Sequence, residues 1–118
     1  MDSKRKLFRI AGDQIKQLIP YMGSCYASDR ITVDGLKVGY MYREVPDSEI
    51  DSGWRFFSGD ESQEYTDNPA NFGIYDVNTI CNYDPAIIPY LDTPESTAIG
   101  RVPGTNNFRR EPQTHIDG

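Results

Sequence analysis

The sequence predicts an α+β fold in which an antiparallel β-sheet, a meander with an Asp-Gly hairpin, packs against one or two short helices. Residues 36–43 and 53–58 alternate apolar side chains with a period of two, which is typical of strands. Asp34 and Gly35 stand between two β-prone runs, and this pair favours a type I′ hairpin turn because both central residues of that turn need a positive φ. Residues 15–22 instead repeat apolar side chains at helical spacing.

The first predicted elements are an edge strand and a short helix. Residues 2–10 form a basic lead-in whose short apolar run suits an edge strand. A helix over 13–20 follows, because Asp13 is a suitable N-cap and Pro20 limits the helix to about two turns. Its apolar positions fall on one face, at i, i+3, i+4 and i+7: Ile15, Leu18, Ile19 and Met22. So short a helix depends on packing that face against something larger.

The larger element is the sheet, which begins with a strand over 23–28. The second arm of the hairpin places four side chains on one face: Leu36, Val38, Tyr40 and Tyr42. The strand over 53–58 has two faces as well: Trp54 and Phe56 on one, Arg55 and Phe57 on the other. An acidic loop then ends the meander. We expect the following side chains to be largely buried: Ile15, Leu18, Ile19, Val38, Tyr40, Trp54 and Phe56.

The second half of the chain predicts one more helical turn and one more strand. Asp84 and Pro85 suit the N-cap and N1 positions of a helical turn, which presents three apolar side chains: Ile87, Ile88 and Leu91. A final strand is expected over 97–102, followed by a mobile tail over 103–118 without periodicity. A length of 118 residues suits a single domain, with an ordered body over 6–102.

The net charge of −6 is concentrated in the middle of the chain. Residues 1–41 carry seven basic and four acidic side chains, residues 42–76 carry two and nine, and residues 77–118 carry three and five. The acidic middle segment would repel a polyanion, which argues against nucleic acid as a direct ligand. It favours a basic protein partner. With no run of 18 apolar residues and no signal-like segment, we expect no membrane contact and a cytoplasmic protein.

The sequence offers little for catalysis or for metal binding. The sole histidine, His115, lies in the expected tail, which argues against Ser-His and Cys-His nucleophiles and against histidine-based metal clusters. No Gly-rich segment has the pattern of a phosphate loop. Cys25 and Cys81 fit no metal spacing, so we expect buried, reduced thiols. The protein is therefore expected to be neither an enzyme nor the carrier of a cofactor.

The carboxylates around the aromatic strand leave two alternatives open. A glycosidase-like acid/base pair would draw on four candidates: Asp51, Asp60, Glu61 and Glu64. A calcium site would use the loop carboxylates Asp60, Glu61, Glu64 and Asp67, but their spacing does not match an EF-hand loop. A solvated acidic turn explains the same residues more simply.

The aromatic and basic residues of this region also have a structural interpretation. Alternating aromatic side chains on a strand usually build a core, which is the role expected for Trp54 and Phe56. Arg43 and Arg55 fall on strand faces opposite the main aromatic face, where they can pair across the sheet with three carboxylates: Glu44, Asp51 and Glu61.

Three motifs of this chain carry a resemblance to a known family: VGYMYRE, DSGWRFFSGDE and the Asn-Tyr-Asp-Pro turn at 82–85. Over residues 13–102 the sequence resembles a bacterial family of unknown function that is grouped with the immunity-protein-thirty-three-like domains of polymorphic toxin systems. The resemblance implies a non-enzymatic protein that binds and neutralises a toxin domain. The alternative is a stand-alone domain that binds another protein or a small ligand.

The acidic surface and the implied toxin partner lead to one hypothesis for the site. Toxin nucleases present basic substrate grooves, and an acidic surface can block such a groove. The residues expected to face the partner are Asp51, Asp60, Glu61, Glu64 and Asp67. The residues expected to build and stiffen the sheet are Arg43, Glu44, Trp54, Arg55 and Phe56.

Overall fold

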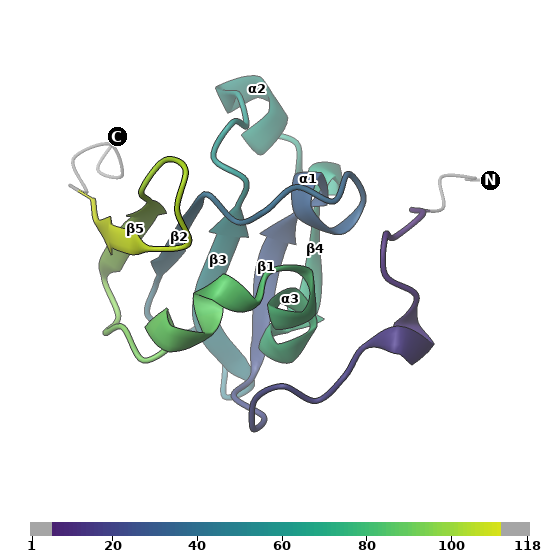
Figure 1. The fold of residues 1–118 in the computed structure, drawn as a ribbon, viewed down its shortest axis with the longest axis horizontal. Coiled ribbons are helices and arrows are strands. Elements are labelled where there is room, and N and C mark those ends of the chain that lie inside the picture. The colour runs from purple at the N-terminus through teal and green to yellow at the C-terminus, as the bar shows by residue number, and fades with distance from the viewer. Residues whose placement is uncertain (1–5, 112–118) are drawn as a thin grey trace.

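A computed structural model of the chain describes residues 6–111, in which six strands form one mixed β-sheet in the order β4-β1-β3-β2-β5-β6 (Figure 1). The strands are β1 (Ser24–Ser28), β2 (Tyr40–Arg43), β3 (Asp51–Phe57), β4 (Phe72–Asp76), β5 (Thr97–Arg101) and β6 (Phe108–Arg110). The α-helices are α1 (Asp29–Thr32), α2 (Gln63–Thr66) and α3 (Val77–Tyr83), and the 3-10 helices are η1 (Gly12–Gln14), η2 (Pro69–Asn71) and η3 (Pro85–Tyr90). The predicted α+β class is confirmed.

The sheet is not the purely antiparallel meander that the sequence predicts. β1 pairs with β3 in parallel, whereas β2 pairs with both β3 and β5 in antiparallel fashion. β4 and β6 add antiparallel strands at the two edges. Residues 29–39 cross one end of the sheet between β1 and β2, which leaves room for β3 between those two strands (Figure 1). The parallel pair follows from this long connection.

The prediction of a hairpin turn at Asp34 and Gly35 is wrong, because these two residues lie at the C-terminal end of helix α1. The Ser28 side chain caps α1 by accepting from the Arg30 backbone N–H at 3.1 Å. At the other end, the Gly35 backbone N–H donates to the Ile31 carbonyl at 3.1 Å, and Gly35 has a φ of 81°. A glycine with positive φ is as typical of a helix C-terminus as of a hairpin, so the local sequence pattern is compatible with either structure.

The helix predicted over 13–20 is also wrong. Only the 3-10 turn η1 forms, and residues 15–22 are neither helix nor strand, although Lys16, Leu18 and Ile19 lie against α3. Two asparagine side chains of α3 replace the helical hydrogen bonds: Asn78 Oδ1 accepts from the Leu18 N–H at 2.7 Å, and Asn82 Oδ1 accepts from the Lys16 N–H at 2.9 Å. Ile19 is buried as expected, but Leu18 is 43% exposed. Ile15 is half-buried.

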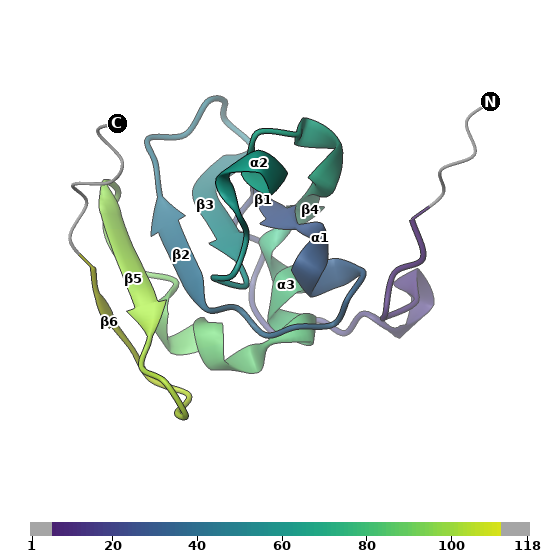
Figure 2. The ribbon, with the colours of Figure 1, turned by 90° about the horizontal axis from the view of Figure 1, so that it is seen from above.

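One face of the sheet carries the hydrophobic core, which α1, α3 and η3 cover (Figures 1 and 2). The sheet contributes five fully buried side chains: Cys25, Ala27, Met41, Trp54 and Phe56. The helical segments contribute another five: Ile31, Val77, Ile80, Cys81 and Ile87. The Trp54 and Phe56 rings stack with centroids 5.8 Å apart, and Trp54 Nε1 donates to the Leu91 carbonyl at 3.2 Å. The burial predicted for Trp54 and Phe56 is confirmed.

Other predicted core positions have mixed outcomes. Val38 is fully buried, and both cysteines are buried free thiols. Leu36 is 40% exposed, and Tyr40 is only half-buried because Met41 is the β2 side chain that enters the core. The face of β2 that carries Tyr40 and Tyr42 therefore points away from the core, opposite to the prediction.

Asp84 caps η3 as predicted and also joins it to the sheet. Its side chain accepts from the Ala86 N–H at 3.1 Å and from the Val38 N–H at 3.0 Å, and it forms an ion pair with Arg101. The carboxylate is almost fully buried, so these partners satisfy a charge that water cannot reach. Of the three side chains that this turn was expected to present, Ile87 and Leu91 are buried and Ile88 is half-buried.

The C-terminal segment is structured further than the sequence indicates. β5 matches the strand predicted over 97–102, and β6 pairs with it inside the expected tail. Phe108 is 7% exposed and its ring lies 5.1 Å from that of Tyr90, which anchors β6. Residues 6–10 form no strand. His115 and the rest of 112–118 lie outside the described residues.

No helix within residues 6–111 combines the length and the apolar character that crossing a membrane requires.

Candidate functional site

The second face of the sheet, which we call the open face, carries exposed and half-buried aromatic side chains. Strand register places these rings on the side opposite the core, together with Arg55 and Ile74: Tyr26 from β1, Tyr40 and Tyr42 from β2, Phe57 from β3, and Phe72 from β4. Tyr26 is 38% exposed and Ile74 is 66% exposed. α2 and η2 border one end of this face (Figure 2). Among residues 6–111, no helical layer covers the rings of the open face.

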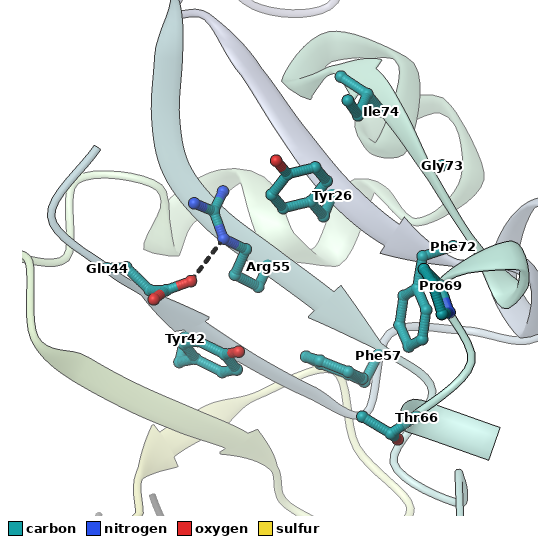
Figure 3. Close-up of a pocket in the computed structure, with 10 residues that line it drawn as sticks. All are labelled: Tyr26, Tyr42, Glu44, Arg55, Phe57, Thr66, Pro69, Phe72, Gly73 and Ile74. Atoms are coloured by element: carbon teal, nitrogen blue, oxygen red, sulfur yellow. Dashed lines mark hydrogen bonds and ion pairs between the residues drawn. The ribbon is translucent and has the colours of Figure 1, made fainter. Parts of the chain in front are cut away.

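Two adjacent pockets hollow the open face. The first, of about 500 Å³, extends over Tyr26, Phe72 and Ile74 toward Glu44 (Figure 3). The second, of about 600 Å³, extends over Tyr40 toward two glutamates, Glu61 and Glu111. Both pockets are lined by three of the same side chains: Tyr42, Phe57 and Thr66. We call the pair the Tyr42–Phe57 groove.

The floor of the groove is a continuous aromatic cluster. The rings of Tyr42 and Phe57 stack with centroids 5.7 Å apart and an angle of 17° between their planes. Tyr40 lies 5.9 Å from Phe57 on one side, and Phe72 meets Phe57 edge-on at 5.6 Å on the other. These contacts pack the rings against one another, so the floor of the groove is a continuous aromatic surface.

Arg55 lies in this face as the centre of an ion-pair cluster. Its Nη1 and Nη2 donate to both oxygens of Asp51, at 3.0 and 2.9 Å, and its Nε donates to Glu44 Oε2 at 2.7 Å. The guanidinium lies 4.4 Å from the centroid of the Tyr26 ring. The predicted pairing of Arg55 with Glu44 and Asp51 is confirmed. A bidentate pair that also stacks on a ring fixes the arginine in one position.

Asp51 has a structural role, because its side chain stabilises the backbone around it. Its side chain is 8% exposed, and the backbone N–H groups of Asp47 and Gly53 each donate to it at 2.9 Å. The hydrogen bonds from Arg55 hold the pKa of Asp51 well below its usual range. Such a carboxylate stays ionised at neutral pH and cannot act as the general acid of a glycosidase.

Arg43 differs from Arg55, and its predicted pairing with a carboxylate across the sheet is wrong. Its guanidinium lies over the Trp54 ring, 5.6 Å from the centroid, on the covered side of the sheet. It donates to the backbone carbonyls of Ser52 and Thr93, each at 3.0 Å. Arg43 therefore ties the loop after η3 to the edge of the core.

The acidic loop, residues 60–67, forms one border of the groove. Glu61 is half-buried and accepts from the backbone N–H groups of Ser58 and Gly59, each at 2.9 Å, so it holds the turn that follows β3. Asp60 lies 3.6 Å from Arg30 Nε, and Glu64 is exposed in the first turn of α2. Asp67 is exposed and accepts from Gln63 Nε2 at 2.8 Å.

The structure brings together only part of the predicted site. The loop carboxylates lie in the segment that follows β3, whereas Asp51 lies at the beginning of β3 and is committed to Arg55. Sequence reasoning missed the groove residues Tyr26, Phe72 and Glu111, and it placed Tyr40 in the core. The alternation of Tyr40 and Tyr42 against Met41 was a usable signal, but it does not say which face is covered.

Cysteine thiols and clusters of His, Cys, Asp or Glu side chains are the groups that often take part in catalysis or metal binding. Burial raises the pKa of Cys81 to about 11 and raises that of Cys25 as well, so both stay protonated at neutral pH. Within the described part of the chain, no three side chains of His, Cys, Asp or Glu gather in a way that could hold a metal ion. The arrangement suits recognition by shape and charge.

Comparison with known proteins identifies a family for this chain. The family model described as the immunity protein Imm33 domain matches residues 25–111. No curated protein and no solved structure matches the chain. Because the matched residues cover most of the sequence, the chain belongs to the Imm33 immunity protein domain family, as the motifs in its sequence indicate.

Proposed function

We propose that this member of the Imm33 family is a non-catalytic immunity protein of a bacterial toxin system, which binds its cognate toxin domain in the cytoplasm and blocks it. The observation that carries the proposal is the open face, where an aromatic groove with a volume of about 500 to 600 Å³ on each side of Tyr42 and Phe57 meets an acidic loop. Protein interfaces favour aromatic side chains at their centre and polar side chains at their rim, and this face has that arrangement.

The charge of the border indicates the kind of toxin. In this proposal, four carboxylates at the end of β3 contact the partner: Asp60, Glu61, Glu64 and Asp67. Asp51 contributes indirectly, because its bond to Arg55 fixes the part of the groove beside Tyr26. A toxin that acts on nucleic acid needs a basic surface, and an acidic immunity protein complements such a surface and speeds the encounter.

The test is stoichiometric inhibition of the toxin domain encoded beside this protein's gene. The toxin's activity is measured with increasing amounts of purified protein, and its mass is recorded afterwards. A binding inhibitor abolishes activity at one equivalent and leaves the toxin intact, and its co-expression restores growth of toxin-producing cells. Undiminished toxicity in the presence of folded protein would overturn the proposal. Protection by far less than one equivalent would reveal an enzyme instead.

A further inference from the structure

The second pocket of the Tyr42–Phe57 groove indicates what part of the partner it receives. Resting on the function proposed above, we infer that it takes an arginine or lysine side chain of the toxin domain, with the stem on the Tyr42 and Phe57 rings and the cationic head beside Glu61 and Glu111. The volume of the pocket, the aromatic rings of its floor and the charges at its end together support this assignment.

The pocket has room for such a side chain. Its volume of about 600 Å³ lies within the range of sites that bind small molecules, so a long side chain fits with space for water. Three glycines line its walls, Gly39, Gly59 and Gly100, and a Cβ on Gly39 would come within 2.0 Å of the Ser58 carbonyl oxygen. Close backbone approach at this position therefore shapes the pocket beside Tyr40.

The floor suits a cation with an aliphatic stem. Lysine and arginine place their methylene groups on apolar surface while the charged head stays near polar groups, and the face of an aromatic ring attracts a cation. Tyr40, Tyr42 and Phe57 offer neighbouring rings with centroids 5.7 to 5.9 Å apart. A side chain lying across them contacts more than one ring.

The end of the pocket is negatively charged. Among residues 6–111, neither Glu61 nor Glu111 forms an ion pair with a basic side chain. Arg101 also lines the pocket, but its charge is matched by Asp84, and its Nε donates to the Val38 carbonyl at 2.9 Å. An anionic group would be repelled here, and a neutral apolar group would desolvate the carboxylates without replacing their water. A cation, by contrast, is attracted to the carboxylates and replaces the interactions that they lose with water.

The field of Glu111 reaches the floor of the pocket. Burial raises the pKa of Tyr40 to about 12, and the neighbouring Tyr42 and the carboxylate of Glu111 add to the rise. A carboxylate that disfavours a phenolate nearby favours a cation at the same place.

The chain's own arginines use the same arrangement elsewhere. Arg55 lies 4.4 Å from the Tyr26 centroid and is paired with Glu44. Arg101 lies 4.8 Å from the Phe108 centroid and is paired with Asp84. The second pocket offers a ring floor and carboxylates of this kind, with Glu111 unmatched by a cation among the described residues.

The experiment measures the dissociation constant of the complex with the toxin domain for four single variants, together with their melting temperatures. Tyr42→Leu removes a ring and Glu111→Gln removes a charge, and each is expected to weaken binding at least tenfold. Tyr42→Phe keeps the ring and should bind within about threefold of wild type. The matched control Glu95→Gln changes an exposed glutamate outside the groove and should leave the constant unchanged.

Substitution of toxin arginines and lysines by methionine completes the test. One of them should weaken binding strongly in the wild-type complex and only weakly with Glu111→Gln, because the two side chains form one contact. If folded Tyr42→Leu and Glu111→Gln bind like wild type, or no basic toxin residue couples to Glu111, this inference fails while the immunity function stands. If the wild-type protein does not bind or inhibit the toxin, the proposed function itself fails.

Discussion

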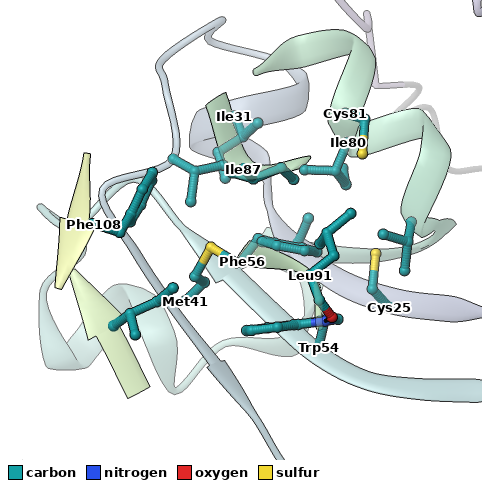
Figure 4. Packing of buried hydrophobic residues seen from close by; sticks show 14 of the residues in the cluster. Cys25, Ile31, Met41, Trp54, Phe56, Ile80, Cys81, Ile87, Leu91 and Phe108 are labelled. Atoms are coloured by element: carbon teal, nitrogen blue, oxygen red, sulfur yellow. Dashed lines mark hydrogen bonds between the residues drawn. The ribbon is translucent and has the colours of Figure 1, made fainter. Parts of the chain in front are cut away.

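The two faces of the sheet use the same kinds of residue for different purposes, as Phe56 and Phe57 show. Phe56 is fully buried, and its ring lies among the side chains of α1, α3 and η3 (Figure 4). Phe57, the next residue of β3, is half-buried on the open face, where its contacts are other rings (Figure 3). Both faces are aromatic. What separates them is the helical layer, so burial on one face supplies stability while the proposed interface lies on the other.

The largest expected effect follows from removing a ring on the covered face. Phe56→Ala leaves a cavity between β3 and the helices and should lower the free energy of unfolding by about 3–5 kcal/mol. Urea unfolding followed by circular dichroism measures the loss. A loss below about 1 kcal/mol would mean that the covered face is not the core of the protein.

Breaking the ion-pair cluster on the open face should cost nearly as much. Arg55→Leu leaves the carboxylate of Asp51, which is 8% exposed, without its cation, and the expected loss is about 3 kcal/mol. The double variant Arg55→Leu/Asp51→Asn removes the unpaired charge and should recover at least half of that loss. Equal stability of the single and double variants would show that the charge pair is not the cause.

The same cluster gives the protein an acid-sensitive contribution to stability. Because the folded protein holds the pKa of Asp51 below its unfolded value, this contribution is present above about pH 4 and is lost as the pH falls through the folded pKa. The difference in unfolding free energy between wild type and Asp51→Asn should therefore shrink on going from pH 7 to acid. Urea titrations of both proteins across this range measure it, and a constant difference would contradict the assignment.

Removing the ring on the open face should affect stability less than binding. Phe57→Ala takes away a half-buried ring and should cost about 1 kcal/mol of unfolding free energy, well below the loss for Phe56→Ala. The proposed interface loses the centre of its floor, so capture of the toxin domain should fall sharply. Thermal melts and pull-down with the toxin measure the two effects. Equal losses of stability for both phenylalanines would remove the distinction between the faces.

The smallest effect on stability is expected in the acidic loop. Asp60→Lys with Glu64→Lys reverses two solvated charges and should change the unfolding free energy by less than about 1 kcal/mol. Against a basic toxin the reversal places like charges opposite each other and should slow association. Melting temperature and association rate are measured side by side. A much lower melting temperature would make the loop structural, and an unchanged rate would place the contact elsewhere.

Local patterns in the sequence predict those features that depend only on residues close together in the chain. Alternation identified the two faces of β3, and Asp84 was recognised as a cap because the residue before a proline at N1 commonly plays that part. Gly35 was recognised as a residue with positive φ, but that requirement is shared by hairpins and helix ends. Its surroundings, not its own conformation, decide between them.

The features that the sequence did not predict correctly depend on contacts between distant segments of the chain. Residues 15–22 have helical spacing, yet Asn78 and Asn82 satisfy their backbone about 60 residues further along the chain. The parallel pairing of β1 with β3 depends on how residues 29–39 cross the sheet. The groove depends on this strand order, because Tyr26 and Phe72 meet Tyr42 and Phe57 only once the strands have been ordered. No pattern within a single strand contains that information.

The strand order also describes how the protein can assemble as it leaves the ribosome. β1, β2 and β3 are the first strands made and occupy the centre of the sheet, and β4, β5 and β6 each add to an outer edge that is already present. No strand has to insert between two others after β3, so the chain can extend its sheet outward in the order of synthesis. The core is complete only when β5 and β6 have added Ile99 and Phe108 to it. The second pocket, which Gly100, Arg101 and Glu111 help to line, is therefore complete only after β6 has been made.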